Sequence, residues 1–319
     1  VGGLQYINGV IKDFGTIAEF IIYVNMLTWP VAVLGWVTSI IQQAEASQKR
    51  INEFLKEEPE IQNTSTNPSK INGNIEFNNV SFIYEDTNIQ ALNEVSFSVD
   101  QGDTLAILGK TGSGKSTILD LIGRLYDINT GSLLVDGIQM DKVHLKSLRE
   151  NIGYVPQDAF LFSDSIKNNI KFGLVDATDQ DVINAAKNAV VHDNIEKFNK
   201  GYDTVLGERG ITLSGGQKQR VSIARAIIKN PNLLLLDDCL SAVDTETEEK
   251  ILNNLAQVTK GKTTIIVSHR ISSAKNADKI IVMDKGRVVQ EGTHESLLDE
   301  DGYYKDLYLN QLSETVNLK

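Results

Sequence analysis

Cysteine is almost absent from this sequence of 319 residues. Cys239 stands alone, so the chain cannot build an internal disulfide framework, and a reducing compartment suits it. Positive charge is also scarce, because 31 Lys and Arg are outnumbered by 42 Asp and Glu, which leaves a net charge of −11. Nucleic acid requires a basic surface on the protein that binds it. The composition therefore predicts no nucleic acid partner.

Metal-ligating and targeting signals are missing as well. Four His and one Cys show no zinc-ligand spacing. No charged segment followed by a cleavage site precedes the first apolar stretch, so we predict no secretory signal peptide. The sequence begins with Val1 rather than Met, and we expect it to be a fragment of a longer protein.

Charge is lacking altogether from Phe20 to Ile41. This stretch is long enough to cross a hydrocarbon core of roughly 30 Å as a helix. Trp29 and Trp36 are typical of membrane helices, and Pro30 is tolerated there although it should kink the helix. The alternative is a buried core helix, which is usually shorter and amphipathic. We predict a membrane span.

The helical pattern continues past the apolar stretch as far as Lys56. A helix over 13–56 would be about 65 Å long, so half of it must protrude into water. Lys49 and Arg50 follow the span closely, which puts this end in the cytoplasm. Residues 1–12 are predicted to be the tail of a truncated membrane segment and a short loop containing Asn8-Gly9 and Lys12-Asp13.

Residues 57–73 are polar, carry two prolines and a glycine, and are predicted to form a linker. From 74 to 319, short β-branched runs alternate with helical stretches, which predicts an α/β domain with a parallel core. The first strands and a hairpin at Lys285-Gly286 are expected to be antiparallel. The predicted strands cover 75–84, 95–99, 104–108, 153–157, 233–237, 263–267, 279–283 and 287–291.

A glycine-rich segment follows the apolar strand 104–108 and leads into a helix. It matches the pattern G-x-x-x-x-G-K-[ST] of a loop that binds the phosphates of ATP. The glycines let backbone N–H groups turn toward the phosphates, and the helix N-terminus attracts anions. Lys115 is expected to reach the β- and γ-phosphates, and Ser116 to ligate Mg²⁺. The segment reads Gly109-Lys110-Thr111-Gly112-Ser113-Gly114-Lys115-Ser116-Thr117.

The continuous apolar run 233–236 is typical of a strand buried on both faces, and two carboxylates follow it. Ligands bind at the carboxyl ends of strands in open α/β sheets. Asp237 is predicted to hold Mg²⁺ through water, and Asp238 to orient or deprotonate the attacking water. Paired carboxylates at a strand end can also be solvated caps, but the phosphate loop favours the catalytic interpretation.

Ser214 and Gln217 can form a capping box at a helix start that two glycines leave bare for a phosphate. With the segment Leu213-Ser214-Gly215-Gly216-Gln217 and the following KQRVSIARAII, the sequence resembles the ABC transporter ATPase family from about Asn74 onward. The resemblance implies an ABC cassette with a mixed sheet and a helical signature subdomain. It also implies a head-to-tail dimer in which this helix start contacts the ATP of a second subunit.

Further positions match the family one at a time. Tyr84 matches the aromatic residue that stacks on adenine, although a core aromatic residue beside Phe82 is the alternative. Gln157 matches the glutamine that meets Mg²⁺ and the attacking water and touches the membrane domain. Asp244 matches a loop that crosses the dimer interface, and His269 the switch histidine that contacts the γ-phosphate. The segment Gly207-Glu208-Arg209-Gly210 resembles one that exporters use to contact coupling helices.

Asp238 departs from the family pattern, which usually has Glu there. The shorter side chain withdraws the carboxylate by about 1 Å, and such a misplacement can cost on the order of 10²-fold in rate. One hypothesis is a slow site in a heterodimer whose intact signature serves the partner's ATP. The rival is a homodimer that uses Asp as a working base.

The predicted protein is an ATPase half-transporter of the plasma (inner) membrane that is multi-pass at full length and has its cassette in the cytoplasm. Its predicted partners are a second half-transporter, the missing transmembrane helices of its own chain, and the lipid bilayer. Two other classes compete. A soluble ABC ATPase acting on nucleic acid would lack the apolar span and show a basic surface, and a regulatory subunit that barely hydrolyses ATP is supported by Asp238 alone. The transported substrate cannot be inferred.

Overall fold

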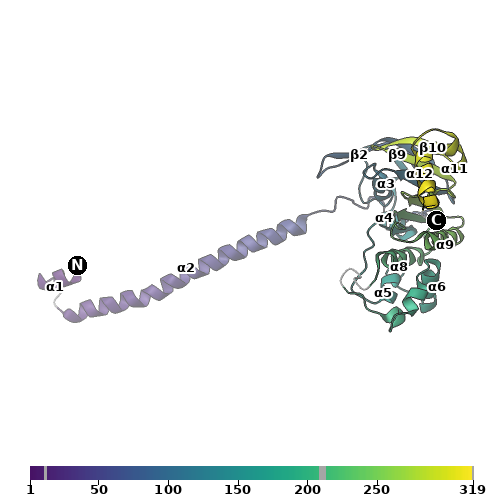
Figure 1. Ribbon diagram of the computed structural model, residues 1–319. Coiled ribbons are helices and arrows are strands. Elements are labelled where there is room, and N and C mark those ends of the chain that lie inside the picture. The colour runs from purple at the N-terminus through teal and green to yellow at the C-terminus, as the bar shows by residue number, and fades with distance from the viewer. Residues whose placement is uncertain (11–12, 208–212, 318–319) are drawn as a thin grey trace. The chain divides into compact units, whose positions relative to one another are not determined.

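The computed structural model describes residues 1–10, 13–207 and 213–317. The chain divides into two compact units, Val1–Glu60 and Ile61–Lys319. The first unit holds two helices, and the second holds all the strands (Figure 1).

The first unit consists of the short helix α1 (Gly2–Ile7) and the long helix α2 (Phe14–Lys56). Asp13 caps α2, because its carboxylate accepts a hydrogen bond from the N–H of Gly15 at 2.9 Å. The helix continues through Pro30 to the end of the predicted range. It is the one helix in the described part of the chain that is long and apolar enough to cross a membrane. Lys12, predicted in the preceding loop, lies outside the described residues.

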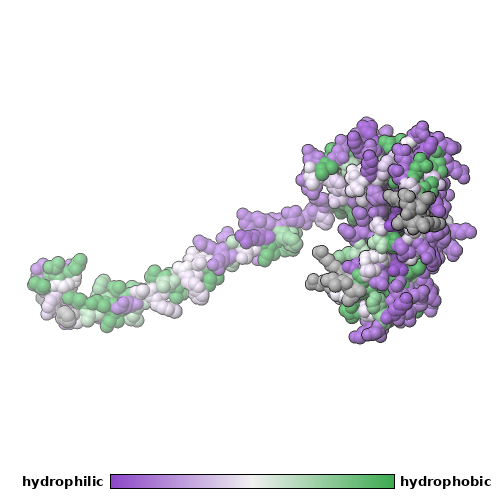
Figure 2. Space-filling model, in the orientation of Figure 1, coloured by the Kyte–Doolittle hydropathy of each residue, from purple (hydrophilic) through white to green (hydrophobic). Residues whose placement is uncertain are grey.

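Apolar side chains cover the first part of α2, and polar ones follow toward Lys56 (Figure 2). Trp29 is 74% exposed and Trp36 is 66% exposed within the chain. The cost of exposing such large apolar surfaces to water is removed by a lipid environment. The distribution along this helix therefore fits a membrane span better than a core helix.

The second unit contains a four-stranded antiparallel sheet in the order β2-β1-β4-β5. Its longest pair is held together by alternating apolar side chains, and Phe77 stacks on Phe97 with ring centroids 4.6 Å apart. The sequence did not predict the third and fourth strands. The strands are β1 (Ile75–Tyr84), β2 (Ile89–Val99), β4 (Thr130–Val135) and β5 (Ile138–Gln139).

The second sheet has six strands in the order β10-β9-β3-β8-β7-β6. All neighbouring pairs are parallel except β9 and β10, which form the antiparallel hairpin expected at Lys285-Gly286. This confirms the predicted mixed sheet with a parallel core. The strands are β3 (Thr104–Gly109), β6 (Ile152–Val155), β7 (Leu233–Asp237), β8 (Thr263–Val267), β9 (Lys279–Asp284) and β10 (Arg287–Gly292).

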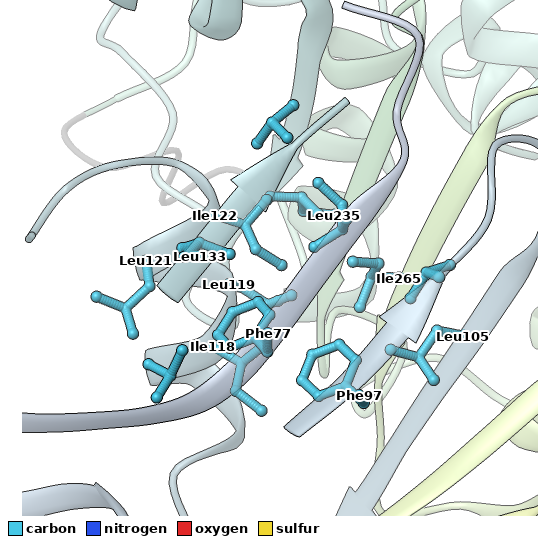
Figure 3. Close-up of a cluster of buried hydrophobic side chains, with 14 of the residues drawn as sticks. Phe77, Phe97, Leu105, Ile118, Leu119, Leu121, Ile122, Leu133, Leu235 and Ile265 are labelled. Atoms are coloured by element: carbon cyan, nitrogen blue, oxygen red, sulfur yellow. The ribbon is translucent and has the colours of Figure 1, made fainter. Parts of the chain in front are cut away.

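Both faces of the six-stranded sheet are buried, which explains its continuous apolar runs. Leu105 and Ile107 of β3 enter the core between the two sheets, whereas Ala106 and Leu108 pack on the opposite side. Figure 3 shows the core between the sheets, where α3 (Lys115–Ile122) contributes most of its apolar side chains. The residues labelled there are Phe77, Phe97, Leu105, Ile118, Leu119, Leu121, Ile122, Leu133, Leu235 and Ile265.

A second core joins the sheet to α5 (Ile166–Lys171), α6 (Asp179–Asn188) and α8 (Gly215–Ile227), which form a separate helical part (Figure 1). The remaining helices are α4 (Leu145–Asn151), α7 (His192–Glu196), α9 (Thr245–Val258), α10 (Ile271–Ala274), α11 (His294–Asp299) and α12 (Tyr303–Asn317), with 3₁₀ turns at Met140–Lys142 and Gly201–Asp203. A third core packs β3 and β9 against α11 and α12, and Leu297 and Tyr304 are buried in it.

Residues 61–74, here called the strap, contain no helix or strand but are fastened to the second unit. The carboxylate of Asp136 accepts hydrogen bonds from three consecutive backbone N–H groups, those of Asn72, Gly73 and Asn74, at 2.7 to 3.1 Å. Asp136 itself adopts the left-handed region, with φ at 51°, which suits an Asp.

The strap also contacts the amino ends of two central strands. The Thr263 hydroxyl donates to the carbonyl of Gly73 at 2.7 Å, and the Asn232 amide donates to the carbonyl of Ile71 at 2.7 Å. A methyl group on Gly73 would lie 2.7 Å from the Thr263 hydroxyl, so this close approach requires glycine. The last part of the predicted linker is therefore bound to the domain.

Replacing Asp136 by Ala should release the strap, because three backbone N–H groups lose a charged acceptor. Hydrogen bonds to a charged group contribute about 2 kcal/mol, so local opening should become at least about tenfold more frequent. Tryptic cleavage after Lys70 in the full-length protein, followed by mass spectrometry, measures this opening. The control is Asp141→Ala, because the strap contacts Asp141 through its main-chain carbonyl, which the substitution preserves. Equal cleavage rates in the two variants would contradict the fastening role of Asp136.

Candidate nucleotide-binding site

The glycine-rich loop lies between the end of β3 at Gly109 and the start of α3 at Lys115. Gly109 and Gly114 adopt φ values of 146° and 97°, which side chains rarely allow. A methyl group on Gly109 would overlap the carbonyl of Met283, and one on Gly114 would overlap that of Ala91. No side chain of the described residues caps the start of α3, so its first N–H groups are available to an anion.

Lys115 lies within this loop and is only 6% exposed. Its ammonium donates to the carbonyls of Gly109 and Lys110 at 2.9 and 2.8 Å. Burial lowers the pKa of Lys115, while the carboxylates of Asp238 and Asp237 oppose that shift. A phosphate group here would supply the strong anionic acceptor that the main-chain carbonyls replace only partly.

Ser116, the first residue after Lys115, faces the end of β7. Its hydroxyl donates to a carboxylate oxygen of Asp237 at 3.0 Å. Asp237 is 5% exposed, and burial raises its pKa above the ordinary range for Asp. A hydroxyl and a carboxylate are oxygen ligands of the type that Mg²⁺ prefers. The Ser116–Asp237 pair therefore fits the predicted role of binding Mg²⁺.

Asp238 and His269 follow two adjacent strands, β7 and β8. The N–H of Asp238 donates to the carbonyl of Val267 at 2.9 Å, which holds the residue at the sheet edge. Its φ is 41°, in a region that Asp adopts more readily than most residues. Burial raises the pKa of Asp238 and lowers that of His269, and the positive charge of Lys115 lowers the His269 pKa further. The lowered pKa of His269 favours the neutral imidazole, whereas the raised pKa of Asp238 disfavours its ionised form.

A cavity of about 270 Å³ connects these groups. Its lining includes most of the phosphate loop and the four other predicted residues Gln157, Asp237, Asp238 and His269. The sequence missed the contributions of β2 and of the end of β8, because no motif marks Ile89, Gln90, Ala91 or Val267 as part of a site. The lining residues are Tyr84, Ile89, Gln90, Ala91, Thr111, Gly112, Gly114, Lys115, Ser116, Thr117, Gln157, Asp237, Asp238, Val267 and His269.

Tyr84 is half-buried at the edge of this cavity and has two kinds of neighbour. Its hydroxyl lies 3.0 Å from the hydroxyl of Thr117, and its ring makes edge contacts with Phe82 and Tyr126. Burial raises the pKa of Tyr84. Both predicted roles use part of this geometry, since the ring packs on aromatic neighbours and also lines the cavity.

The signature segment does not line the cavity of its own chain. The predicted capping box is confirmed: Ser214 caps α8, its hydroxyl accepts from the N–H of Gln217, and the Gln217 side chain accepts from the N–H of Ser214. A methyl group on Gly216 would lie 2.7 Å from the carbonyl of Ala242. The start of α8 therefore packs directly on the loop before Asp244, which caps α9.

Of the predicted exporter segment 207–210, residues 208–210 lie outside the described residues. Among the predicted loop residues, Gly109, Lys110 and Ser113 are not part of the cavity lining. The Ser113 hydroxyl is buried and has no hydrogen-bond partner among the described residues. A buried polar atom of this kind suits a loop whose hydrogen bonds a ligand completes.

A glycine-rich loop between a buried strand and a helix, facing carboxylates at a nearby strand end, defines a P-loop nucleotide-binding domain. Residues 92–241 match the family model described as ABC transporter. The chain therefore carries an ABC transporter ATP-binding domain. The signature helix start at Ser214 distinguishes this class from other P-loop proteins.

Several curated proteins are similar to this chain. It is 46% identical over 92% of its length to the uncharacterized ABC transporter ATP-binding protein YknU of Bacillus subtilis, and covers 51% of that protein. It is 42% identical over 95% of its length to the multidrug resistance-like ATP-binding protein MdlA of Escherichia coli, and covers 51% of it. It is 42% identical over 92% of its length to the ATP-dependent lipid A-core flippase of Pseudomonas fluorescens, and covers 49% of it.

A solved structure is also similar to this chain. A bacterial Atm1-family ABC exporter with ATP bound matches with a TM-score of 0.84 and 39% identity, over 91% of this chain and 51% of that chain. The chain thus spans about half the length of the curated relatives it matches.

The close approach at Gly114 can be tested in the absence of nucleotide. Replacing Gly114 by Ala should destabilise the loop by about 2 kcal/mol, because the new methyl group overlaps the carbonyl of Ala91. Gly112→Ala is the matched control, since Gly112 also has a positive φ, 78°, but has no atom within 4 Å of the added methyl group. Thermal unfolding of both variants measures the difference. A Gly114→Ala protein as stable as Gly112→Ala would argue against this contact.

Proposed function

We propose that the chain is the motor of an ABC exporter, which binds ATP with Mg²⁺ in the 270 Å³ cavity and hydrolyses it to drive export across a membrane. The observation that carries this proposal is the convergence of Lys115, the Ser116–Asp237 pair, Asp238 and His269 on one cavity. We assign residues 1–12 and 13–56 to the membrane part, 57–73 to the linker and 74–319 to the ATP-binding domain.

Each group has a distinct task in this proposal. Lys115 and the N-terminus of α3 neutralise the β- and γ-phosphates. Ser116, Asp237 and Gln157 would hold Mg²⁺, which supplies charge neutralisation at the phosphates when bound. Asp238 orients or deprotonates the attacking water, and His269 contacts the γ-phosphate as a neutral donor.

A second subunit completes the site in this account. Ser214 and Asp244 both lie outside the cavity of their own chain, and the start of α8, where Gly215 and Gly216 carry no side chain, is suited to a phosphate. The Ser214 segment is suited to bind phosphate but does not line the cavity of its own chain. An ATP molecule bound to an opposing chain would explain this placement. The partner is a second half-transporter, identical or different, that contacts this chain head to tail.

The coupling surface is proposed to lie near Gln157. An apolar cavity of about 310 Å³ lies beside β6 and α8. The exposed side chain of Phe172 lines this cavity and packs on Phe162, which in turn packs on Phe160. A contiguous apolar surface of this kind marks a contact with another element. Transmembrane helices supplied by the longer protein would occupy it, with α2 in the plasma (inner) membrane and the ATP-binding domain in the cytoplasm.

The role of Lys115 is tested by ATP affinity. Lys115→Ala should weaken ATP binding by at least about tenfold, because a buried ammonium that pairs with phosphate contributes about 1.5 to 3 kcal/mol. Fluorescent ATP analogue titration of the full-length protein measures this loss. Lys146→Ala serves as a control, since Lys146 is 77% exposed and lies in α4. Unchanged affinity in Lys115→Ala would refute the proposed site.

The Asp238 substitution is proposed to make this a slow or ATP-retaining site. Asp238→Glu should raise ATP turnover by about tenfold or more, because the longer side chain restores the position of the carboxylate. Asp238→Asn should lower the already slow turnover of the protein assayed alone, because the remaining carboxylate is lost. Steady-state phosphate release from the purified full-length protein measures both variants. Brisk wild-type turnover that vanishes in Asp238→Asn would favour the working-base homodimer instead.

A further inference from the structure

The segment that carries His269 is held by the helix α12 as well as by the sheet. The side-chain amide of Gln311 donates from its nitrogen to the carbonyl of His269 at 2.9 Å. Its oxygen accepts from the N–H of Ile271 at 2.9 Å. One side chain thus binds both main-chain groups that flank Arg270.

This two-point contact is specific to an amide side chain. Only Asn and Gln offer one donor and one acceptor side by side, and Gln is longer than Asn by one methylene. The two hydrogen bonds resemble those between neighbouring strands. They therefore fix both the orientation and the position of the main chain at residues 269–271. His269 itself projects from this main chain toward the cavity that contains Lys115 and Asp238.

The same segment is held on its other side through Arg270. Its guanidinium donates to the carbonyls of Ser241 and Val243 at 3.0 and 3.1 Å, and to the buried carboxylate of Glu248 at 2.5 Å. These contacts connect the His269 segment to the loop before Asp244. The Gln311 contact comes from a different element and completes the restraint.

Gln311 can be changed without releasing α12 from the domain. Tyr304, near the start of the helix, is fully buried and its hydroxyl bonds to the ring of His294 at 2.6 Å. The N–H of Tyr304 also donates to the side chain of Gln290 at 3.1 Å. These anchors lie two turns away from Gln311, so the helix keeps its place when the amide is removed.

We propose that Gln311 is a positioning residue that sets the place of His269 at the γ-phosphate and thereby links α12 to ATP hydrolysis. This proposal rests on the proposed ATPase function of the cavity. Gln311 is not itself a lining residue of the cavity, and it holds His269 through the main-chain carbonyl. We therefore expect it to act on the hydrolytic step and not on ATP binding.

The test compares Gln311→Ala and Gln311→Glu with the control Asn310→Ala in the full-length protein. Asn310 is an exposed neighbour on the same helix. Gln311→Ala should lower kcat for ATP by about tenfold, because displacement of a catalytic group by a fraction of an ångström is costly, and should leave KM unchanged. Asn310→Ala should leave both constants unchanged.

Hydrogen–deuterium exchange supplies a readout that does not depend on turnover. The amide of Ile271 should exchange about fivefold faster in Gln311→Ala, because it loses its acceptor. Gln311→Glu preserves that acceptor and should keep the amide protected, while kcat stays below the wild-type value because the donor to His269 is lost.

An unchanged exchange rate at residues 269–271 in Gln311→Ala would overturn the proposal. It would also be overturned if KM rose while kcat stayed constant, or if Asn310→Ala had the same effect. A wild-type protein that binds no ATP would overturn the proposed function instead, and the exchange comparison would still decide whether Gln311 restrains the His269 segment.

Discussion

The register of three adjacent parallel strands determines where the phosphate loop, His269 and the carboxylate pair lie. Ile107 of β3 and Asp237 of β7 both pair with Val267 of β8, so β7 and β8 end at the same level and β3 continues to Gly109. The phosphate loop, His269 and the carboxylate pair therefore leave the sheet at one edge. The hydrogen bond from Ser116 to Asp237 then joins the loop to the strand that lies beyond β8. A shift of one residue would turn Asp237 toward the opposite face of the sheet.

The charges at this edge explain why nucleotide and cation belong together. Burial raises the pKa of Asp237 and of Asp238, because a carboxylate loses hydration there. A triphosphate adds further negative charge, and Lys115 alone cannot balance it. In the proposed function, the N-terminus of α3 and a divalent cation at Ser116 would supply the remaining positive charge. The charges at this edge therefore fit the proposed binding of ATP together with a divalent cation.

Features encoded by short stretches of sequence could be predicted. The continuous run 233–236 predicts a strand buried on both faces, and the spacing of Ser214 and Gln217 predicts a capping box. The phosphate loop is equally local. The strand Thr130–Val135 was missed because it opens with Thr-Gly and is only partly buried, so no apolar run marks it.

Features that depend on distant residues could not be predicted. The carboxylate of Asp136 binds main chain more than sixty positions earlier, and Gln311 binds His269 across 42 positions. An isolated Asp or Gln in a polar stretch gives no sign of such a partner. The wall of the cavity formed by Gln90 and Ala91 was also missed, since it appears only when β2 lies beside the loop.

The attachment of the strap has a mechanical consequence. Thr263 and Asn232 stand at the amino ends of β8 and β7, whereas ATP would press on the carboxyl ends of the same strands. Tension that arrives through residue 61 would act along the length of the strands. A sheet extends least in this direction. The central sheet can thus transmit force between the strap at one end of its strands and a bound nucleotide at the other end.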